Sequence, residues 1–176
     1  MKPIAEAFAA PGRVLIADAP EGQDARLIAG ATREAGSLLQ VARDDARVAR
    51  LAELLAFFDP ELEVIRFPAW DCLPYDRVGP HRDIVAQRLD AFTRLMEGAE
   101  QSRPRVVLTT VNALLQRTPP RAAFEGRLLR LARGATLSPD SLLAFLADNG
   151  YLRVETVSEA GEYACLLYTS PSPRDS

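Results

Sequence analysis

The sequence predicts an α/β fold, in which a doubly wound domain with a parallel sheet is followed by a smaller, incomplete α+β domain. Short apolar runs alternate along the chain with segments whose apolar residues recur at helical spacing. The run Arg105–Thr110 is continuous and β-branched, which is typical of a strand covered on both faces of a parallel sheet. The pattern changes after Pro119 and Pro120, so we expect one domain over residues 1–120 and a second over residues 121–165.

The first elements are expected in the order strand, helix, strand. The apolar run over residues 13–18 predicts a strand, and a Pro-Glu-Gly turn leads from it into a helix over Gln23–Ala35 that ends at Gly36. The apolar run Ser37–Ala42 predicts the next strand. A strand that returns after a helix in this way is the repeating unit of a parallel sheet.

Two further helices and a third strand follow before Arg105–Thr110. Asp44 is the predicted N-cap of a helix that ends at Pro60, and Glu63–Phe67 predicts a strand. A proline-rich loop over residues 68–80 then precedes a helix over residues 83–96. The residues expected on the inward face of that helix are Ile84, Val85, Leu89, Phe92 and Leu95.

The second domain is expected to run strand, helix, strand, over residues 126–132, 138–148 and 151–157. Ser138 is the predicted N-cap, with a proline at the first helical position, and the Asn149-Gly150 pair predicts the end of the helix. Residues 166–176 have no apolar period and contain two prolines, so we expect them to be disordered and interpret them as an artefactual tail.

Composition excludes several classes of protein. The net charge of -3 and the pI of about 5.3 give no positive excess that would attract a nucleic acid to the whole surface. Two distant cysteines and a single histidine have no metal-ligand spacing, so no metal is expected. The sequence has no secretory segment and no run of about 18 apolar residues. A cytoplasmic protein without a membrane span is therefore expected.

The turn before the first helix is where a P-loop would lie. Compared with the pattern G-x-x-x-x-G-K-[ST], only Gly22 fits. Ala17 replaces the first glycine, Gln23 the phosphate-binding lysine and Asp24 the hydroxyl residue that ligates magnesium. Carboxylates at the amino end of a helix repel a triphosphate, so we expect a surface turn that binds no nucleotide and no other cofactor.

The loop after the third strand carries aromatic and cationic side chains. Trp70 and Tyr75 could stack on bases, because each such contact stabilises a complex by about 1–3 kcal/mol. Packing of these residues against the sheet edge is the favoured interpretation. Arg77, Arg82 and Arg88 suggest a small cationic patch. The interpretation that they are simply solvated surface residues is favoured over a binding patch. The residues proposed for contact with a partner or a nucleic acid are Trp70, Tyr75, Arg77, His81 and Arg82.

The same loop carries acidic residues beside His81. Asp71, Asp76 and Asp83 suggest acid-base or metal chemistry, but the sequence offers no second histidine and no nucleophile near them. Helix capping and surface solvation are therefore favoured, with Asp83 in the first turn of its helix. Cys72 is interpreted as a small packing residue rather than a reactive thiol. No catalytic residue is assigned.

The segment FPAWDCLPYD over residues 67–76, followed by PHRDIV over 80–85 and Arg88-Leu89, closely resembles the amino-terminal region of bacterial transcription-repair coupling factors (Mfd). The segments VVLTTVNALLQR over 106–117, Asn149-Gly150-Tyr151 and GEYA over 161–164 follow in the family's order. The W-x-x-L-P-Y-D block is far more specific than a lone glycine motif.

The resemblance implies a fold and a role. The family's amino-terminal region is similar to the excision-repair protein UvrB, so residues 1–120 are expected to form a degenerate, RecA-like domain that lacks a P-loop. Residues 121–165 are expected to begin a domain like UvrB domain 2 that interacts with UvrA. The full protein would be an ATP-driven DNA translocase that removes stalled RNA polymerase with Mg and ATP bound elsewhere. This chain would be a noncatalytic scaffold in contact with the rest of that protein.

The resemblance stops after the GEYA segment, where the family continues with an Arg-Gly-Gly or similar turn and this chain continues with Cys165. No UvrA-binding residue is therefore transferred to it. Two alternatives stay open: a fragment of UvrB, which would need an intact P-loop, and a free-standing nucleotide-binding α/β protein.

Overall fold

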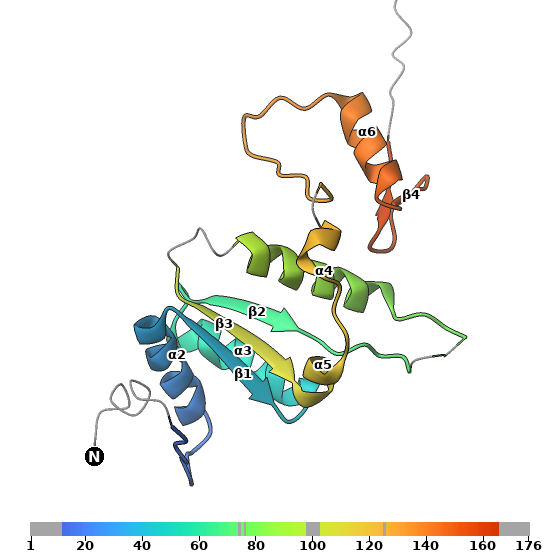
Figure 1. The fold of residues 1–176 in the computed structure, drawn as a ribbon. Coiled ribbons are helices and arrows are strands. Elements are labelled where there is room, and N and C mark those ends of the chain that lie inside the picture. The colour runs from blue at the N-terminus through green and yellow to red at the C-terminus, as the bar shows by residue number, and fades with distance from the viewer. Residues whose placement is uncertain (1–11, 74, 76, 98–102, 125, 166–176) are drawn as a thin grey trace, which may run out of the picture. The chain divides into compact units, whose positions relative to one another are not determined.

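The computed structural model describes residues 12–73, 75, 77–97, 103–124 and 126–165, which divide into two units, one up to Arg121 and one from Ala122 onward (Figure 1). Each unit is described by itself. Within the described residues, no helix combines the length and the apolar character that a membrane crossing requires.

Three parallel strands form the centre of the first unit (Figure 1). They are β1 (Ser37–Ala42), β2 (Glu63–Phe67) and β3 (Arg105–Thr110), in the spatial order β1-β3-β2. Val106 of β3 lies opposite Leu38 on one side and Val64 on the other. The run that predicts the most buried strand is therefore the central one, and the predicted bounds of all three strands are confirmed.

Helices pack on both faces of this sheet. On one face, α2 (Gln23–Ala35) and α3 (Asp45–Phe58) build a core whose fully buried members include Ala25, Leu51, Leu55, Val106 and Leu108. On the other, α4 (Arg82–Glu97) and the short α5 (Val111–Leu115) close a smaller core of Ile65, Phe67, Ala91 and Ala113. This arrangement confirms the predicted α/β class.

The helix α3 is held at both ends. Asp44 is its N-cap, as predicted, and one of its carboxylate oxygens accepts a 2.8 Å hydrogen bond from the backbone N–H of Arg47. At the other end the Asp59 carboxylate accepts hydrogen bonds of 2.5 and 2.6 Å from Arg33 of α2. The Arg33 side chain, first among several causes, holds the pKa of the buried Asp59 below its usual value. This pair ties α2 to α3.

The second unit contains one well-formed helix and little else. The helix α6 (Pro139–Asp148) begins after Ser138 and ends at Asn149, as predicted. Two strands of two residues each, β4 (Leu152–Arg153) and β5 (Glu162–Tyr163), pair in parallel. A short 3-10 helix, η1 (Arg121–Phe124), spans the division between the units. Among the described residues from 122 onward, none is fully buried.

Three strand predictions are wrong in whole or in part. Residues 13–18 and 126–132 form no strand, and of 151–157 only Leu152–Arg153 does. A strand needs a neighbour that satisfies its backbone, and apolar sequence alone does not supply one. Val14, Leu15 and Ile16 are accordingly exposed.

The inward face of α4 also differs from the prediction. Leu89 and Leu95 are exposed, whereas Ala91 and Arg88 are buried. The remaining predicted members of that face, Ile84, Val85 and Phe92, are partly buried. The helix therefore presents a narrower apolar stripe to the sheet, and that stripe includes a charged residue.

Candidate functional site

The turn before α2 is the first candidate, because a P-loop would bind phosphate there. Gly22 is the N-cap of α2 and has a φ of 87°, a left-handed conformation that favours glycine. One oxygen of the Asp24 carboxylate accepts a 2.8 Å hydrogen bond from the backbone N–H of Ala25, and the other pairs with Arg47 of α3. The chain's own carboxylate thus lies at the positive end of the helix.

A second ion pair lies beside the first. Glu21 pairs with Arg50 of α3 at 2.9 Å, and Arg50 also contacts Glu53 at 3.2 Å. Ala17, in the irregular segment before α2, and Gln23, the first residue of α2, contribute no cation. The arginines that reach this turn are therefore already paired with acidic side chains, and the turn presents negative charge where a nucleotide phosphate would need positive charge.

The carboxyl edge of the sheet is the second candidate, because parallel strands direct the loops after them to that edge. The hydroxyl of Thr109 on β3 donates a 2.9 Å hydrogen bond to the backbone carbonyl of Phe67 at the end of β2. The backbone N–H of Trp70 donates a 2.8 Å hydrogen bond to the side-chain oxygen of Gln116, the C-cap of α5. These bonds fix the start of the W-x-x-L-P-Y-D segment against β3 and α5.

Arg88 lies at the centre of this second candidate site. Arg88 is only 1% exposed to solvent. One terminal nitrogen, Nη1, donates to the carbonyl of Pro68 at 2.6 Å and, more weakly, to the side-chain oxygen of Gln116 at 3.4 Å. The guanidinium carbon lies 4.3 Å from the ring centre of Phe67 and 4.2 Å from that of Trp70. Burial lowers the pKa of the Arg88 guanidinium from its usual value.

The burial of Arg88 corrects the sequence interpretation, which grouped it with Arg77 and Arg82 in a cationic patch or a solvated face. Arg77 and Arg82 are exposed, so only those two belong to the surface. A signal for the difference was present: Arg88 follows Ile84 by four residues and precedes Phe92 by four, which places it on the inward stripe of α4. Gln116, the other member of this cluster, had no such signal.

The remaining predicted contact residues are spread along the loop. Trp70 is partly buried beside Arg88, whereas Tyr75 is fully exposed and has a φ of 76°, which is uncommon for a residue with a side chain. His81 is exposed just before α4. The structure therefore brings Trp70 into the buried cluster and leaves Tyr75, Arg77, His81 and Arg82 at the surface.

The acidic residues of this loop act in local hydrogen bonds. Asp71 accepts bonds of 3.1 and 3.3 Å from the backbone N–H of His81, and the ring nitrogen Nδ1 of His81 accepts one of 3.3 Å from the backbone N–H of Asp83. Asp83 lies in the first turn of α4, as predicted. Asp76 lies outside the described residues. Across the described part of the chain, no three His, Cys, Asp or Glu side chains form a group that could hold a metal.

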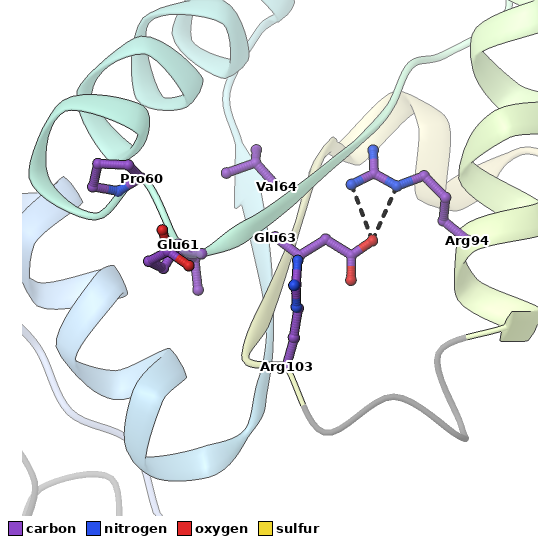
Figure 2. Close-up of a pocket in the computed structure, with 7 residues that line it drawn as sticks. Pro60, Glu61, Glu63, Val64, Arg94 and Arg103 are labelled. Carbon is purple, nitrogen blue, oxygen red and sulfur yellow. Dashed lines mark hydrogen bonds and ion pairs between the residues drawn. The ribbon is translucent and has the colours of Figure 1, made fainter. Parts of the chain in front are cut away.

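A pocket of about 410 Å³ lies at the opposite, amino edge of the sheet (Figure 2). Arg94 of α4 reaches into it, where its Nε donates a 3.0 Å hydrogen bond to one carboxylate oxygen of Glu63, the first residue of β2, and its Nη2 lies 3.0 Å from the same oxygen in an ion pair. Arg103 and Glu61 contribute one further charge of each sign. Opposite charges balance within this pocket, so its surface shows no preference for a charged ligand.

Several curated proteins with similar sequences are named transcription-repair-coupling factor. The one from Escherichia coli (strain K12) is 34% identical over 134 residues, and the one from Haemophilus influenzae 33% over 144. The one from Mycobacterium bovis is 33% identical over 159 residues. These alignments cover 76%, 81% and 88% of this chain but only 11% or 12% of each relative. The chain matches no family model.

Proposed function

Because the chain belongs to the family of transcription-repair-coupling factors, we propose that it forms a noncatalytic scaffold segment of such a protein. The chain spans about a tenth of the relatives' length, and in this proposal the activity of the whole protein resides largely in parts outside it. In this proposal the whole protein displaces stalled RNA polymerase and recruits UvrA in transcription-coupled nucleotide excision repair.

The observation that carries the noncatalytic role is the occupied amino end of α2. A bound triphosphate would have to displace Asp24 from Arg47 and would face Glu21 and Asp18 as well. No lysine replaces the lost cation, because Gln23 stands at that position. The loss of the Asp24–Arg47 pair, the repulsion from Glu21 and Asp18 and the missing lysine all raise the free energy of the nucleotide complex.

The proposal assigns parts to the two units. Residues 1–120 serve as a degenerate, RecA-like domain homologous to UvrB, and residues 121–165 begin the domain that contacts UvrA. RNA polymerase, DNA, ATP and Mg bind to parts of the longer protein, and the first unit contacts those parts. Trp70, Tyr75, Arg77, His81 and Arg82 remain the residues proposed for contact with a partner or a nucleic acid.

Titration of the chain with a fluorescent ATP analogue in the presence of magnesium tests the noncatalytic role. We expect no saturable change in anisotropy, with an intact P-loop ATPase as the positive control in the same buffer. Saturable, magnesium-dependent binding would overturn the proposal. That result would favour a free-standing nucleotide-binding α/β protein, or a UvrB fragment, instead.

Capture of UvrA tests the recruitment role. The bait is a version of the chain extended past Ala164 with the Arg-Gly-Gly turn and following strand of the family, and the unextended chain is the comparison. We expect immobilised extended bait to retain purified UvrA and the unextended chain to retain much less. Equal failure of both baits would refute recruitment through the second unit while leaving the noncatalytic role intact.

A further inference from the structure

The strand β1 forms one edge of the parallel sheet, and among the described residues no strand pairs with its outer side (Figure 1). Its inner side is bonded to β3, where the Gly36 carbonyl accepts a 3.0 Å hydrogen bond from the backbone N–H of Arg105. Backbone groups of successive residues point to alternate sides of a strand, so those of Ser37, Leu39 and Val41 point away from β3. These three residues offer their N–H and carbonyl groups to a further strand.

The β1 edge lacks the features that usually discourage further pairing. Edge strands in natural proteins often carry charged residues or proline. The opposite edge of this sheet does so, because β2 contains Glu63 and Arg66. In contrast, β1 has the sequence SLLQVA, without a charge or a proline. The exposed side-chain amide of Gln40 donates a 3.2 Å hydrogen bond to the Val41 carbonyl, and a bonded strand can replace that contact.

The side chains of the outward-pointing residues add an apolar strip to this edge. Leu39 is 55% exposed and Val41 is 37% exposed. Both lie on the face of the sheet away from α2 and α3, because Leu38 on the opposite face packs against the core that those helices form. Unpaired backbone groups beside exposed apolar side chains are the combination that pairing with another strand would satisfy.

We propose that the β1 edge is a pairing surface for a second copy of this chain, with the two β1 strands antiparallel about a two-fold axis at Leu39. In this register Leu39 of one copy lies opposite Leu39 of the other, and Ser37 lies opposite Val41. Each of these pairs exchanges two backbone hydrogen bonds. Because the three outward-pointing residues are symmetric about Leu39, every one of their N–H and carbonyl groups is bonded.

A second copy fits this edge because β1 is uncharged. Like charges that face one another across two strands oppose pairing, and a strand paired with itself would double any charge that it carried. The absence of charge also means that β1 offers nothing to select an acidic or a basic peptide. Two-fold pairing keeps Leu39 and Val41 of both copies on one face of a continuous sheet, where they cover each other, and it closes at a dimer.

Analytical ultracentrifugation of the intact chain between about 1 μM and about 1 mM tests for this dimer. We expect a reversible shift from monomer to dimer as the concentration rises. Amide hydrogen exchange at the same concentrations tests the pairing itself: the Leu39 and Val41 amides should exchange more slowly as the dimer forms, because their N–H groups point outward in the monomer. A monomer at every concentration would overturn the proposal and leave the edge to a strand of another protein. So would a dimer in which these two amides gain no protection.

The variant Leu39→Lys tests the register, because it places two like charges at the two-fold axis. Leu39 is largely exposed, so we expect the variant to fold, with circular dichroism as the check, and its dimer dissociation constant to rise at least about tenfold. Leu89→Lys is the matched control: Leu89 is 48% exposed but lies on α4, so the same change there should leave the constant unchanged. Equal effects of the two substitutions would overturn the proposal. The pairing does not depend on the proposed scaffold role, and its failure would leave that role untouched.

Discussion

The two units contain helices of similar predictability but very different burial. In the first unit, α3 buries Val48, Leu51 and Leu55 against α2 and the sheet. In the second unit, α6 has bounds that the sequence predicts equally well, yet none of its residues is fully buried. The difference shows that local sequence sets where a helix begins and ends, whereas burial depends on elements that come from elsewhere in the chain.

The largest expected difference in stability between the two units follows from replacing a leucine of each by alanine. Leu55 is fully buried, so Leu55→Ala should lower the free energy of unfolding by about 2–5 kcal/mol. Leu143 of α6 is only partly buried, so Leu143→Ala should change it by less than about 1 kcal/mol. Urea denaturation followed by circular dichroism measures both. Equal losses would mean that the second unit has a core of its own.

A smaller effect is expected from the helix N-caps. The Asp44 side chain accepts a hydrogen bond from the Arg47 backbone, so Asp44→Ala should cost about 0.5–2 kcal/mol. Ser138 occupies the same position at α6 but makes no side-chain capping bond, so Ser138→Ala should cost only a few tenths, about 0.3 kcal/mol. The same denaturation experiment compares them. A larger loss at Ser138 would contradict the view that α3 is the better-anchored helix.

The smallest expected effect is a pH dependence of the first unit. Hydrogen bonds from Arg33 hold the pKa of Asp59 below its usual value, and the backbone N–H of Arg47 does the same, as the first of several causes, for Asp44. Because both folded-state pKa values lie below the unfolded value of about 3.9, their stabilisation is present above that pH and is lost as the pH falls through the folded values.

Asp59→Asn tests the Asp59 share of that dependence. We expect the variant to be less stable than the parent chain near neutral pH and to lose less stability on acidification, so that the two urea midpoints approach each other below about pH 4. Urea midpoints across a pH series measure this difference. A constant difference between the two urea midpoints at every pH would show that protonation of Asp59 does not change the stability that its pair with Arg33 contributes.

Much of the first unit could be predicted from the sequence because its signals are local. Gly36 ends α2, Asp44 begins α3, and the continuous run of β3 indicates a strand covered on both faces. Residues 13–18 carry an equally apolar run, but a strand also needs a neighbouring edge, and pairing is not encoded within six residues. The predicted elements that are wrong are therefore all strands, and α2, α3, α4 and α6 were predicted to within a residue or two, whereas the short α5 and η1 were not predicted.

The candidate sites divide in the same way. The mismatch between the turn before α2 and the P-loop pattern was visible from Gln23 and Asp24 alone, since a motif with fixed spacing can be checked residue by residue. The arginines that pair with its carboxylates come from α3, and no pattern within the turn indicates them. Arg88 was misread because its charge suggested exposure, although its helical position placed it inward; Gln116 joins the cluster only through the fold.

Native-state hydrogen exchange tests the contrast between the units most directly. We expect amides of β3, at the centre of the sheet, and of α3 to exchange only with global unfolding, and amides of α6 and β4 to exchange through much less costly local opening. Slow exchange in α6 equal to that in β3 would contradict it. That outcome would show that the second unit is held by a core as complete as that of the first.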